Sequence, residues 1–401
     1  GDWSSDVCSS DLIVHNYYKV PGGEDTVVEN EKKMLLENGH DVEMYIRHND
    51  EINYNNKLIN LRLLFNSIFS VKTYKEIKKI IKDKNIDIVH VHNTLPLISP
   101  SVYYSAKACK IPVVQTIHNF RLLCPGATFT RNNKICEKCV SGGLMNSIKY
   151  KCYRNSRIQT IVSASILKIH RVLGIYDKID GYIALTNFNK KKLSSLVDSN
   201  KIFVKPNFVS INNNSNNVYK REYFLYLGRL DKIKGVDLIL KAWKQLNGIK
   251  LLIVGKGPDE DFLKEYVRLN NISNVEFLGF KEKKDVKELI AKAKALIIAS
   301  QWYEGFPMTI IESFSMGTPV IAGKIGNMSN IIEEYNNGLF FEYNNYDSLI
   351  KKVNEVNNNE KLMKKLEIGA RNSYDLKYTE IINYKILMQI YSDVGVDNDK
   401  M

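Results

Sequence analysis

Short runs of apolar residues recur along this chain and alternate with longer segments of helical periodicity. The runs fall into two series, separated by a polar stretch near residue 210. The first series covers 13–15, 41–45, 86–91, 113–117 and 181–185, and the second covers 223–227, 250–254, 275–278, 295–299 and 318–322. Apolar strands of this kind are typical of parallel sheets covered by helices on both faces, with right-handed crossovers. The pattern therefore predicts an α/β protein made of two doubly wound, Rossmann-like domains.

The domain boundaries follow from composition. A length of 401 residues allows about two to three domains of ~150 residues each. The asparagine-rich connector 210–220 predicts an N-terminal domain over 13–209 and a second domain over 210–377, followed by a separate helical segment over 378–401. Residues 1–12 read like a translated sequencing adapter or a polar leader, so we expect a non-native leader and a first strand that begins at Ile13.

The segment 304–312, Glu-Gly-Phe-Pro-Met-Thr-Ile-Ile-Glu, predicts an anion site next to two carboxylates. Pro307 is expected at the first helical position, where the N–H that it lacks would have no partner anyway. The remaining N–H groups of the first turn and the helix dipole favour an anion such as a diphosphate. Glu304 would precede the helix and Glu312 would lie about two turns inside it, both able to accept hydrogen bonds from sugar hydroxyls. The predicted binding residues are Glu304, Gly305, Phe306, Pro307, Met308, Thr309 and Glu312.

A basic loop follows the first strand of the second series. It contains Arg229 and Lys234 within 226–235. Cations here would stabilise the negative charge that grows on a diphosphate leaving group, and would do so more strongly in the transition state than in the ground state. The alternative is a surface pair beside Asp231, ordinarily worth ~0–1 kcal/mol. For the two glutamates, the alternative is a solvated helix face.

The first domain offers weaker candidates. Gly22 and Gly23 follow the first strand and would let backbone N–H groups approach a phosphate or sugar, although such a pair is commonly just a turn. His118 follows the strand 113–117, at the end of the sheet where ligands gather. A structural histidine is the alternative. His90 and His92 are expected to share one face of their strand, and no role is assigned to them.

These segments resemble the signature of the retaining glycosyltransferases of family 4, and the resemblance spans about 13–391. It implies the GT-B fold, in which two Rossmann-like domains have parallel sheets facing across a cleft and a C-terminal helix crosses back to the first domain. The family pattern implies that Glu304 contacts the donor sugar and that Glu312 holds the ribose hydroxyls. It also implies that Arg229 and Lys234 bind the diphosphate, and that His118 hydrogen-bonds the donor sugar or its phosphate.

The resemblance implies transfer of a sugar from a nucleoside diphosphate donor to an acceptor hydroxyl, with retention at the anomeric carbon. UDP is favoured by family frequency, and the acceptor would be a saccharide or a lipid-linked saccharide of surface polysaccharide or glycolipid synthesis. Catalysis is expected to need no cofactor, because the basic loop takes the place of a cation. The alternatives are a GT-B sugar-nucleotide epimerase or hydrolase and a non-catalytic nucleotide-binding scaffold.

Four cysteines, Cys124, Cys136, Cys139 and Cys152, have a spacing that could hold a structural zinc ion. The central pair has the Cys-x2-Cys spacing, while the outer two are separated from it by loosely defined loops. Free thiols are the alternative reading.

The net charge of +13 is concentrated in part within 149–171, which carries six positive residues and no acidic one. Together with the apolar segment 63–69, this stretch predicts a basic amphipathic helix that docks on an anionic membrane. An ordinary core-facing helix with a solvated edge is the alternative. The chain has no nucleic-acid-binding motif, no secretory signal and no apolar run of ~18 residues, so we expect a cytoplasmic protein, peripheral at the membrane, without a nucleic-acid partner.

Overall fold

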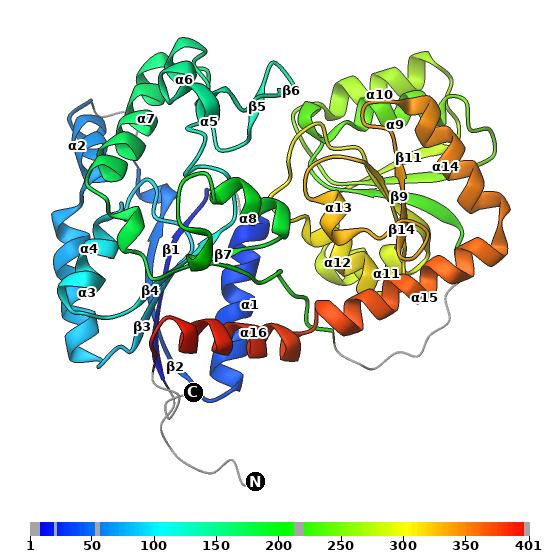
Figure 1. Ribbon diagram of the computed structural model, residues 1–401. Helices are drawn as coiled ribbons and strands as arrows, with labels where there is room; N and C mark the ends of the chain where they lie inside the picture. Colours follow the sequence, from blue (N-terminus) through cyan, green and yellow to red (C-terminus); the bar gives the residue numbers. More distant parts are fainter. Residues whose placement is uncertain (1–8, 20–21, 53–56, 212–219, 397–401) are drawn as a thin grey trace, which may run out of the picture. The chain divides into compact units, whose positions relative to one another are not determined.

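The computed structural model describes residues 9–19, 22–52, 57–211 and 220–396, which form two compact units (Figure 1). Unit 1 contains the described residues up to Thr128, Glu137–Asn207 and those from Glu380 onward. Unit 2 contains Phe129–Cys136 and the described part of Phe208–Thr379. The change of unit at 207/208 lies two residues before the expected boundary. From the sequence we expect a cysteine-containing insertion over 124–152 in the first domain, but its hairpin at 129–136 is grouped with unit 2.

Unit 1 is built on a parallel sheet of six strands within the described residues, in the order β2-β1-β3-β4-β7-β8. Its strands are β1 (Ser10–Tyr17), β2 (Asp41–His48), β3 (Ile88–Val91), β4 (Val113–Ile117), β7 (Gly181–Ala184) and β8 (Ile202–Val204). The strand order reverses between β1 and β3, which is the kind of position where open α/β sheets bind ligands.

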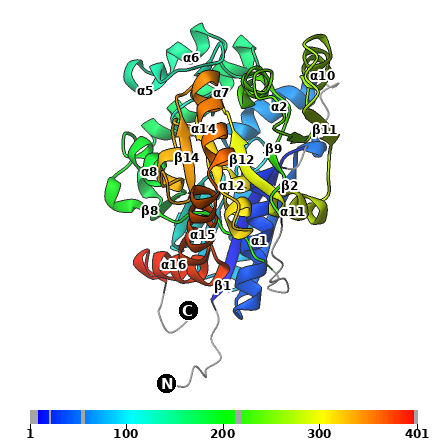
Figure 2. The same cartoon turned by 90° about the vertical axis from the view of Figure 1, so that its right-hand side faces the viewer.

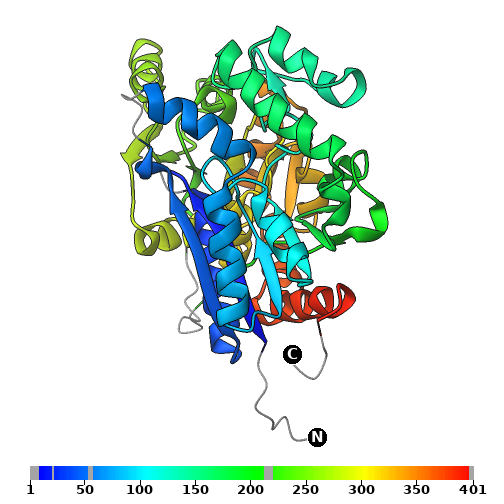
Figure 3. The same cartoon turned by 90° about the vertical axis from the view of Figure 1, so that its left-hand side faces the viewer.

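Helices lie on both faces of this sheet (Figures 1 and 3). On one face, Ile77 of α3 and Val102 of α4 pack against Leu12, Val14 and Val89 of the strands. The helices of unit 1 are α1 (Gly23–Glu37), α2 (Lys57–Ile68), α3 (Val71–Asp83), α4 (Ser101–Ala108), α5 (Lys138–Gly142), α6 (Met145–Lys149), α7 (Arg157–Val172), α8 (Asn187–Leu193) and α16 (Glu380–Asp393), with 3-10 turns η1 (Asn49–Glu51), η2 (Tyr176–Lys178) and η3 (Ser199–Lys201). The C-terminal helix α16 thus belongs to unit 1.

The first strand begins earlier than predicted, at Ser10 and not at Ile13. Ser9 and Asp11 are fully buried, and both hydrogen-bond Nδ1 of His40, at 3.0 and 2.8 Å. Residues 9–12 therefore pair and pack as part of the sheet, because a histidine 29 residues away from Asp11 completes their hydrogen bonds. Residues 1–8, including Cys8, lie outside the described part of the chain.

The basic segment 149–171 is not one helix. It spans the end of α6, a turn, and α7, which begins at Arg157 because the Ser156 side chain accepts from Gln159 N–H at 3.3 Å. Ile166 and Leu167 of α7 are buried, whereas Ile158 and Ile161 are exposed. α7 therefore faces the core on one side and exposes apolar side chains on another, and docking on a membrane stays a prediction.

Unit 2 has a second parallel sheet of six described strands, in the order β11-β10-β9-β12-β13-β14. Its strands are β9 (Tyr223–Leu227), β10 (Leu251–Val254), β11 (Val275–Gly279), β12 (Ala293–Ile298), β13 (Val320–Gly323) and β14 (Gly338–Phe341); a separate hairpin pairs β5 (Thr130–Arg131) with β6 (Lys134–Ile135). With the strands counted in chain order, the sheet reads 3-2-1-4-5-6, the order of dinucleotide-binding domains.

Helices also cover both faces of the second sheet, among them orange α14 (Figure 2). One core cluster joins Phe224 and Tyr226 of β9 to Trp243 of α9 and Leu349 of α14, all buried. The helices of unit 2 are α9 (Val236–Trp243), α10 (Glu260–Leu269), α11 (Lys283–Ala291), α12 (Met308–Ser315), α13 (Met328–Ile331), α14 (Tyr346–Asn358) and α15 (Glu360–Lys377), with the 3-10 turn η4 (Lys232–Lys234). The prediction of two doubly wound parallel-sheet domains is confirmed.

Candidate functional site

The two loops predicted to bind a nucleotide sugar both emerge at the point where the strand order of unit 2 reverses. β9 and β12 are neighbours in the sheet although six elements, from η4 to α11, separate them in the chain. The loop after β9 carries Arg229 and Lys234, and the loop after β12 carries Glu304. Ligands of open α/β sheets bind outside the carboxyl ends of strands at such a switch point.

Lys234 and Glu304 form an ion pair in which Nζ donates to Oε1 at 2.7 Å. Ser300 Oγ donates to the same oxygen at 2.6 Å. Glu304 is 8% exposed, and Lys234 Nζ also lies 5.2 Å from the centre of the Trp302 ring. The structure thus brings together the acid and the cation that the sequence placed in separate motifs.

The carboxyl group of Glu304 is held in its charged form. Burial alone would raise the pKa of Glu304, but the positive charge of Lys234 and the hydrogen bonds from Lys234 and Ser300 lower it below the usual value. An ionised, largely buried carboxylate is a strong hydrogen-bond acceptor for a hydroxyl group. The same ion pair holds the ammonium group of Lys234 where it can also bind an anionic ligand.

The backbone joins the two loops. Gln301 N–H donates to the carbonyl of Ile233 at 2.7 Å, and Gly235, with φ of +70°, packs against the carbonyl of Ala299. Asn327, which is fully buried, donates to the carbonyl oxygens of Glu304 and Gly305. These contacts fix the backbone on both sides of the ion pair.

Gly235 is therefore a position where an added methyl group should disturb the site. A Cβ at this residue would lie 2.1 Å from the Ala299 oxygen, in a left-handed conformation that costs about 1–3 kcal/mol for other residues. We expect Gly235→Ala to lower turnover by about 10²-fold, because displacing Lys234 by ~1 Å can have such an effect. Steady-state kinetics and a melting curve measure both consequences.

Gly248→Ala is the matched control, since Gly248 has φ of +74° but no atom within 4 Å of an added Cβ. This control should lose stability without losing activity. Equal activity in the two variants would contradict the positioning role of Gly235.

The helix after Glu304 differs in detail from the prediction. Pro307 is the N-cap and not the first helical residue, so Met308 and Thr309 open α12. Glu312 is the fifth residue of α12, which places it just over one turn inside the helix and not two. Burial raises the pKa of Glu312, and Lys283 and Lys287 of α11 act against that rise. Glu312 is thus surrounded by different cations from those near Glu304.

Arg229 is the most accessible of the predicted groups. Its side chain is 67% exposed and pairs with Asp231 Oδ2 at 2.8 Å. The loop with Gly255 and Gly257 lies against the loop that carries Arg229, since a Cβ on Gly255 would meet the carbonyl oxygen of Gly228 at 1.9 Å. These glycines therefore allow close packing of two loops, which explains a glycine pattern that resembles a dinucleotide fingerprint only weakly.

In unit 1, His118 ends a chain of buried polar groups. Its Nε2 lies 2.9 Å from Nδ1 of His92, whose Nε2 lies 3.2 Å from Oε1 of Glu31. Burial lowers the pKa of His92 to about 3 and that of His118 well below its usual value, so both rings are neutral at pH 7.

One placement of protons satisfies the contact between His118 and His92. In it, the proton of His92 is on Nε2, which lies 3.2 Å from the Glu31 carboxylate, a group that only accepts. Nδ1 of His92 then accepts from Nε2–H of His118. His118 consequently presents Nδ1 as a hydrogen-bond acceptor.

Glu31 is the centre of this buried network. Its Oε2 accepts from Lys205 Nζ at 2.8 Å, and its Oε1 lies 3.0 Å from Nδ1 of His90. Tyr391 of α16 and Asn383 extend the network to His90 and Lys205. His90 and His92, to which no role was assigned, thus belong to a buried structural cluster.

The predicted zinc ligands do not gather in the described part of the chain. The group of potential metal ligands found there is Glu31, His90 and His92, whose ligand atoms lie within 4.8 Å of one another. Lys205 already balances the charge of Glu31. Cys124, Cys139 and Cys152 lie in unit 1, while Cys136 is assigned to unit 2. The zinc site stays a prediction that metal analysis of the purified protein would test.

Gly22 and Gly23 begin α1, with Gly22 as its N-cap. Gly22 N–H donates to Asp25 Oδ2 at 2.9 Å, so its amide is engaged by the protein instead of pointing at a ligand. Glu24 and Asp25 occupy the first turn of the helix. The other oxygen of Asp25 lies 2.8 Å from Nε2 of His15.

Sequence reasoning missed several residues that shape the site, namely Ser300, Trp302, Asn327, Glu31 and Lys205. Ser300 and Trp302 lie close to Glu304 in the chain and could have been suspected from the end of their strand. Asn327 lies 23 residues beyond Glu304, and no spacing pattern points to it.

The chain matches two family models. Residues 210–373 match the model of glycosyl transferases group 1, and residues 21–213 match that of glycosyltransferase family 4. An uncharacterized glycosyltransferase of Methanocaldococcus jannaschii is 28% identical over 362 residues, which cover 88% of this chain and 90% of that protein.

Solved structures share the fold. A glycosyltransferase from Rickettsia africae superimposes with a TM-score of 0.69 at 20% identity, covering 96% of this chain and 98% of the other. HepE of Anabaena in complex with UDP gives a TM-score of 0.66 at 16% identity, covering 96% and 100%.

Proposed function

Because the chain belongs to the family 4 type of glycosyltransferases with the GT-B fold, we propose that it transfers a sugar from a nucleoside diphosphate donor to an acceptor hydroxyl with retention. Unit 2 would bind the donor, and unit 1 would bind the acceptor. The observation that carries this proposal is the Lys234–Glu304 pair at the strand switch of unit 2.

Each group of the pair suits one part of the donor. Lys234, together with Arg229 and the first-turn amides of α12, would hold the diphosphate, whose charge grows as the bond from sugar to phosphate breaks. The carboxylate of Glu304 would accept a hydrogen bond from a hydroxyl of the donor sugar. Glu312 would hold the ribose hydroxyls.

With its proton on Nε2, where it would donate to His92, His118 suits one of its two expected partners better than the other. An acceptor nitrogen suits a sugar hydroxyl, which can donate, and does not suit a phosphate oxygen, which only accepts at neutral pH. We therefore assign His118 to a hydroxyl of the donor sugar.

For retention, the acceptor oxygen would attack the anomeric carbon from the side of the leaving phosphate. A carbon–oxygen bond forms to the acceptor while the bond to the phosphate breaks, and a phosphate oxygen takes the acceptor's proton. This route requires no enzymic nucleophile and no metal, and the family assignment supports it.

HepE of Anabaena, a solved relative in complex with UDP, favours UDP as the leaving nucleotide. We propose a saccharide or lipid-linked saccharide of surface polysaccharide or glycolipid synthesis as the acceptor, at the cytoplasmic face of a membrane. Within the described residues, no helix has the length and apolarity needed to cross a bilayer.

A thermal-shift panel tests the donor class. UDP at about 100 times its Kd should stabilise the protein by about 2.7 kcal/mol, while GDP and ADP at equal concentration should have smaller effects. The anomeric configuration of the product, measured by NMR, should match that of the donor. An inverted product would contradict the proposed route; turnover of donor without acceptor would indicate the epimerase or hydrolase, and binding without turnover the scaffold.

A further inference from the structure

Unit 1 contains a cavity of about 470 Å3 beyond the carboxyl ends of its strands. Residues that follow four strands line it: Asn49 after β2, Tyr18 after β1, Leu95 after β3 and Arg121 after β4. The reversal of strand order between β1 and β3 therefore opens into this cavity. Its volume lies in the range of small-molecule sites, about 300–1,000 Å3.

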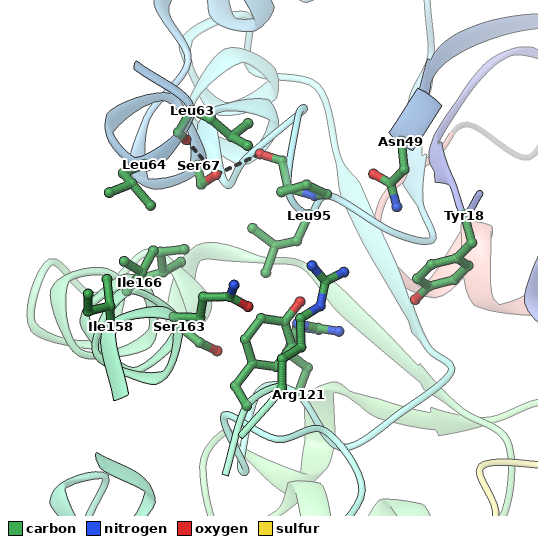
Figure 4. Close-up of a pocket in the computed structure, with 15 residues that line it drawn as sticks. Tyr18, Asn49, Leu63, Leu64, Ser67, Leu95, Arg121, Ile158, Ser163 and Ile166 are labelled. Carbon is green, nitrogen blue, oxygen red and sulfur yellow. Dashed lines mark hydrogen bonds between the residues drawn. The ribbon is translucent and has the colours of Figure 1, made fainter. Parts of the chain in front are cut away.

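The cavity has an apolar end and a polar end (Figure 4). Leu63 and Leu64 of α2 lie across from Ile158, Val162 and Ile166 of α7. Tyr18, Asn49 and Arg121 lie toward the other end, as the close-up shows. This lining suits a ligand that has an apolar part and a polar part.

The polar end favours an anion. The guanidinium groups of Arg121 and Arg154 each lie 5.4 Å from the centre of the Tyr153 ring. Burial would raise the pKa of Tyr153, but these two arginines lower it below its usual value. The negative charge of Glu24 would offset the positive charge of Arg121. Burial raises the pKa of Glu24, however, and so weakens its charge at neutral pH.

The outer surface of the same helices is unusually apolar. Phe65 of α2 and Met145 of α6 are exposed to 66% and 71%, and Ile158 of α7, which also lines the cavity, is exposed to 70%. Further exposed apolar residues lie nearby in the sequence, namely Phe69, Val71, Val140, Ile161, Ile169, Val172 and Leu173. Helices α2 and α7 lie side by side (Figures 1 and 3), and the residues 149–171 around them carry no acidic group. Apolar and basic side chains together suit the surface of an anionic bilayer.

We propose that this cavity binds the lipid phosphate of the acceptor, with a long apolar chain between α2 and α7 and the phosphate at Arg121 and Arg154. The inference rests on the proposed function, because it names the class of acceptor that unit 1 would receive. The apolar surface around the cavity would place the protein where such a lipid is found.

Calorimetric titration of the full chain with farnesyl phosphate, below its micelle concentration, tests the proposal. We expect one site per chain, with binding at least about tenfold tighter than that of farnesol, which lacks the phosphate, or of inorganic phosphate, which lacks the chain. Equal affinity for farnesol would overturn the assignment of the phosphate end.

Two pairs of variants locate the site. Val162→Trp fills the cavity and should weaken farnesyl phosphate binding at least tenfold, whereas Ile169→Trp, on the same helix but outside the cavity, should not. Arg121→Gln should also weaken binding about tenfold, whereas Arg157→Gln removes one charge from the surface of α7 without effect. Wild-type affinity in Val162→Trp would exclude this cavity as the site.

Binding of UDP to unit 2 separates this inference from the proposed function. Each variant should keep the wild-type thermal shift with UDP, and an unchanged denaturant unfolding transition of unit 1 shows that the unit carrying the substitution is folded. If transfer to a water-soluble acceptor proceeds while farnesyl phosphate does not bind, the lipid site is wrong and the proposed function stands. If farnesyl phosphate binds but no donor does, the assignment of an acceptor site falls.

Discussion

Replacing Glu304 by glutamine is expected to lower turnover by about 10²-fold or more. Glutamine keeps the size of the side chain but cannot pair with Lys234, and its neutral amide oxygen is a weaker acceptor for the donor-sugar hydroxyl. Removing one preorganised group of this kind typically costs 10²–10³-fold in kcat. Initial rates of sugar transfer at saturating donor measure the effect.

The loss of turnover should depend on Glu304 and on its partner Lys234, and not on an exposed glutamate of unit 2. Glu334→Gln, at an exposed position of unit 2, should leave the rate unchanged. Lys234→Ala should be as slow as Glu304→Gln, and the double variant should be little slower than either, because the two groups act as one. Full activity in either single variant would refute the assignment of the site.

Replacing Lys205 by methionine is expected to destabilise the protein by about 3–5 kcal/mol, since it leaves the charge of Glu31 buried without its partner. Lys205 is 1% exposed and donates to Glu31 Oε2 at 2.8 Å and to Asn383 Oδ1 at 3.0 Å. Although burial opposes it, Lys205 and the histidines hold the pKa of Glu31 well below its usual value. The carboxylate of Glu31 therefore contributes stability above its unfolded pKa of about 4.3, and loses it as the pH falls through its lower folded pKa.

Denaturant unfolding, followed separately for each transition, measures this loss. Lys191→Met, the same change at an exposed position of α8, should cost less than about 0.5 kcal/mol. Adding Glu31→Gln to Lys205→Met should restore part of the stability, because it removes the stranded charge. A cost below ~1 kcal/mol for Lys205→Met would show that Glu31 is compensated in another way.

The buried strands could be predicted from the sequence because a strand covered on both faces is a continuous apolar run. The predicted bounds of β4 and β9 coincide with those observed. The start of β1 could not be predicted, since the buried polar side chains of Ser9 and Asp11 are satisfied by each other and by His40, which is distant in the sequence.

The site was predictable in its components and not in its contacts. Glu304 and Lys234 each stood out in a motif, but they are 70 residues apart in the chain, and no local pattern shows that they touch. Glu31 and Lys205 are separated by 174 residues and stood out in neither motif nor composition. Such pairs are set by the order of strands in a sheet, which the sequence expresses only indirectly.

The position of α16 has a consequence for how the protein is made. The hydroxyl of Tyr391 is hydrogen-bonded to Nδ1 of His90, and Asn383 contacts both Lys205 and the carbonyl of Pro206. These residues of α16 therefore complete the interior of unit 1. A ribosome therefore delivers every residue of unit 2 before the final piece of unit 1. The unit whose synthesis begins first is thus the last to be complete in sequence, and a chain that ended before residue 380 would lack these contacts of unit 1.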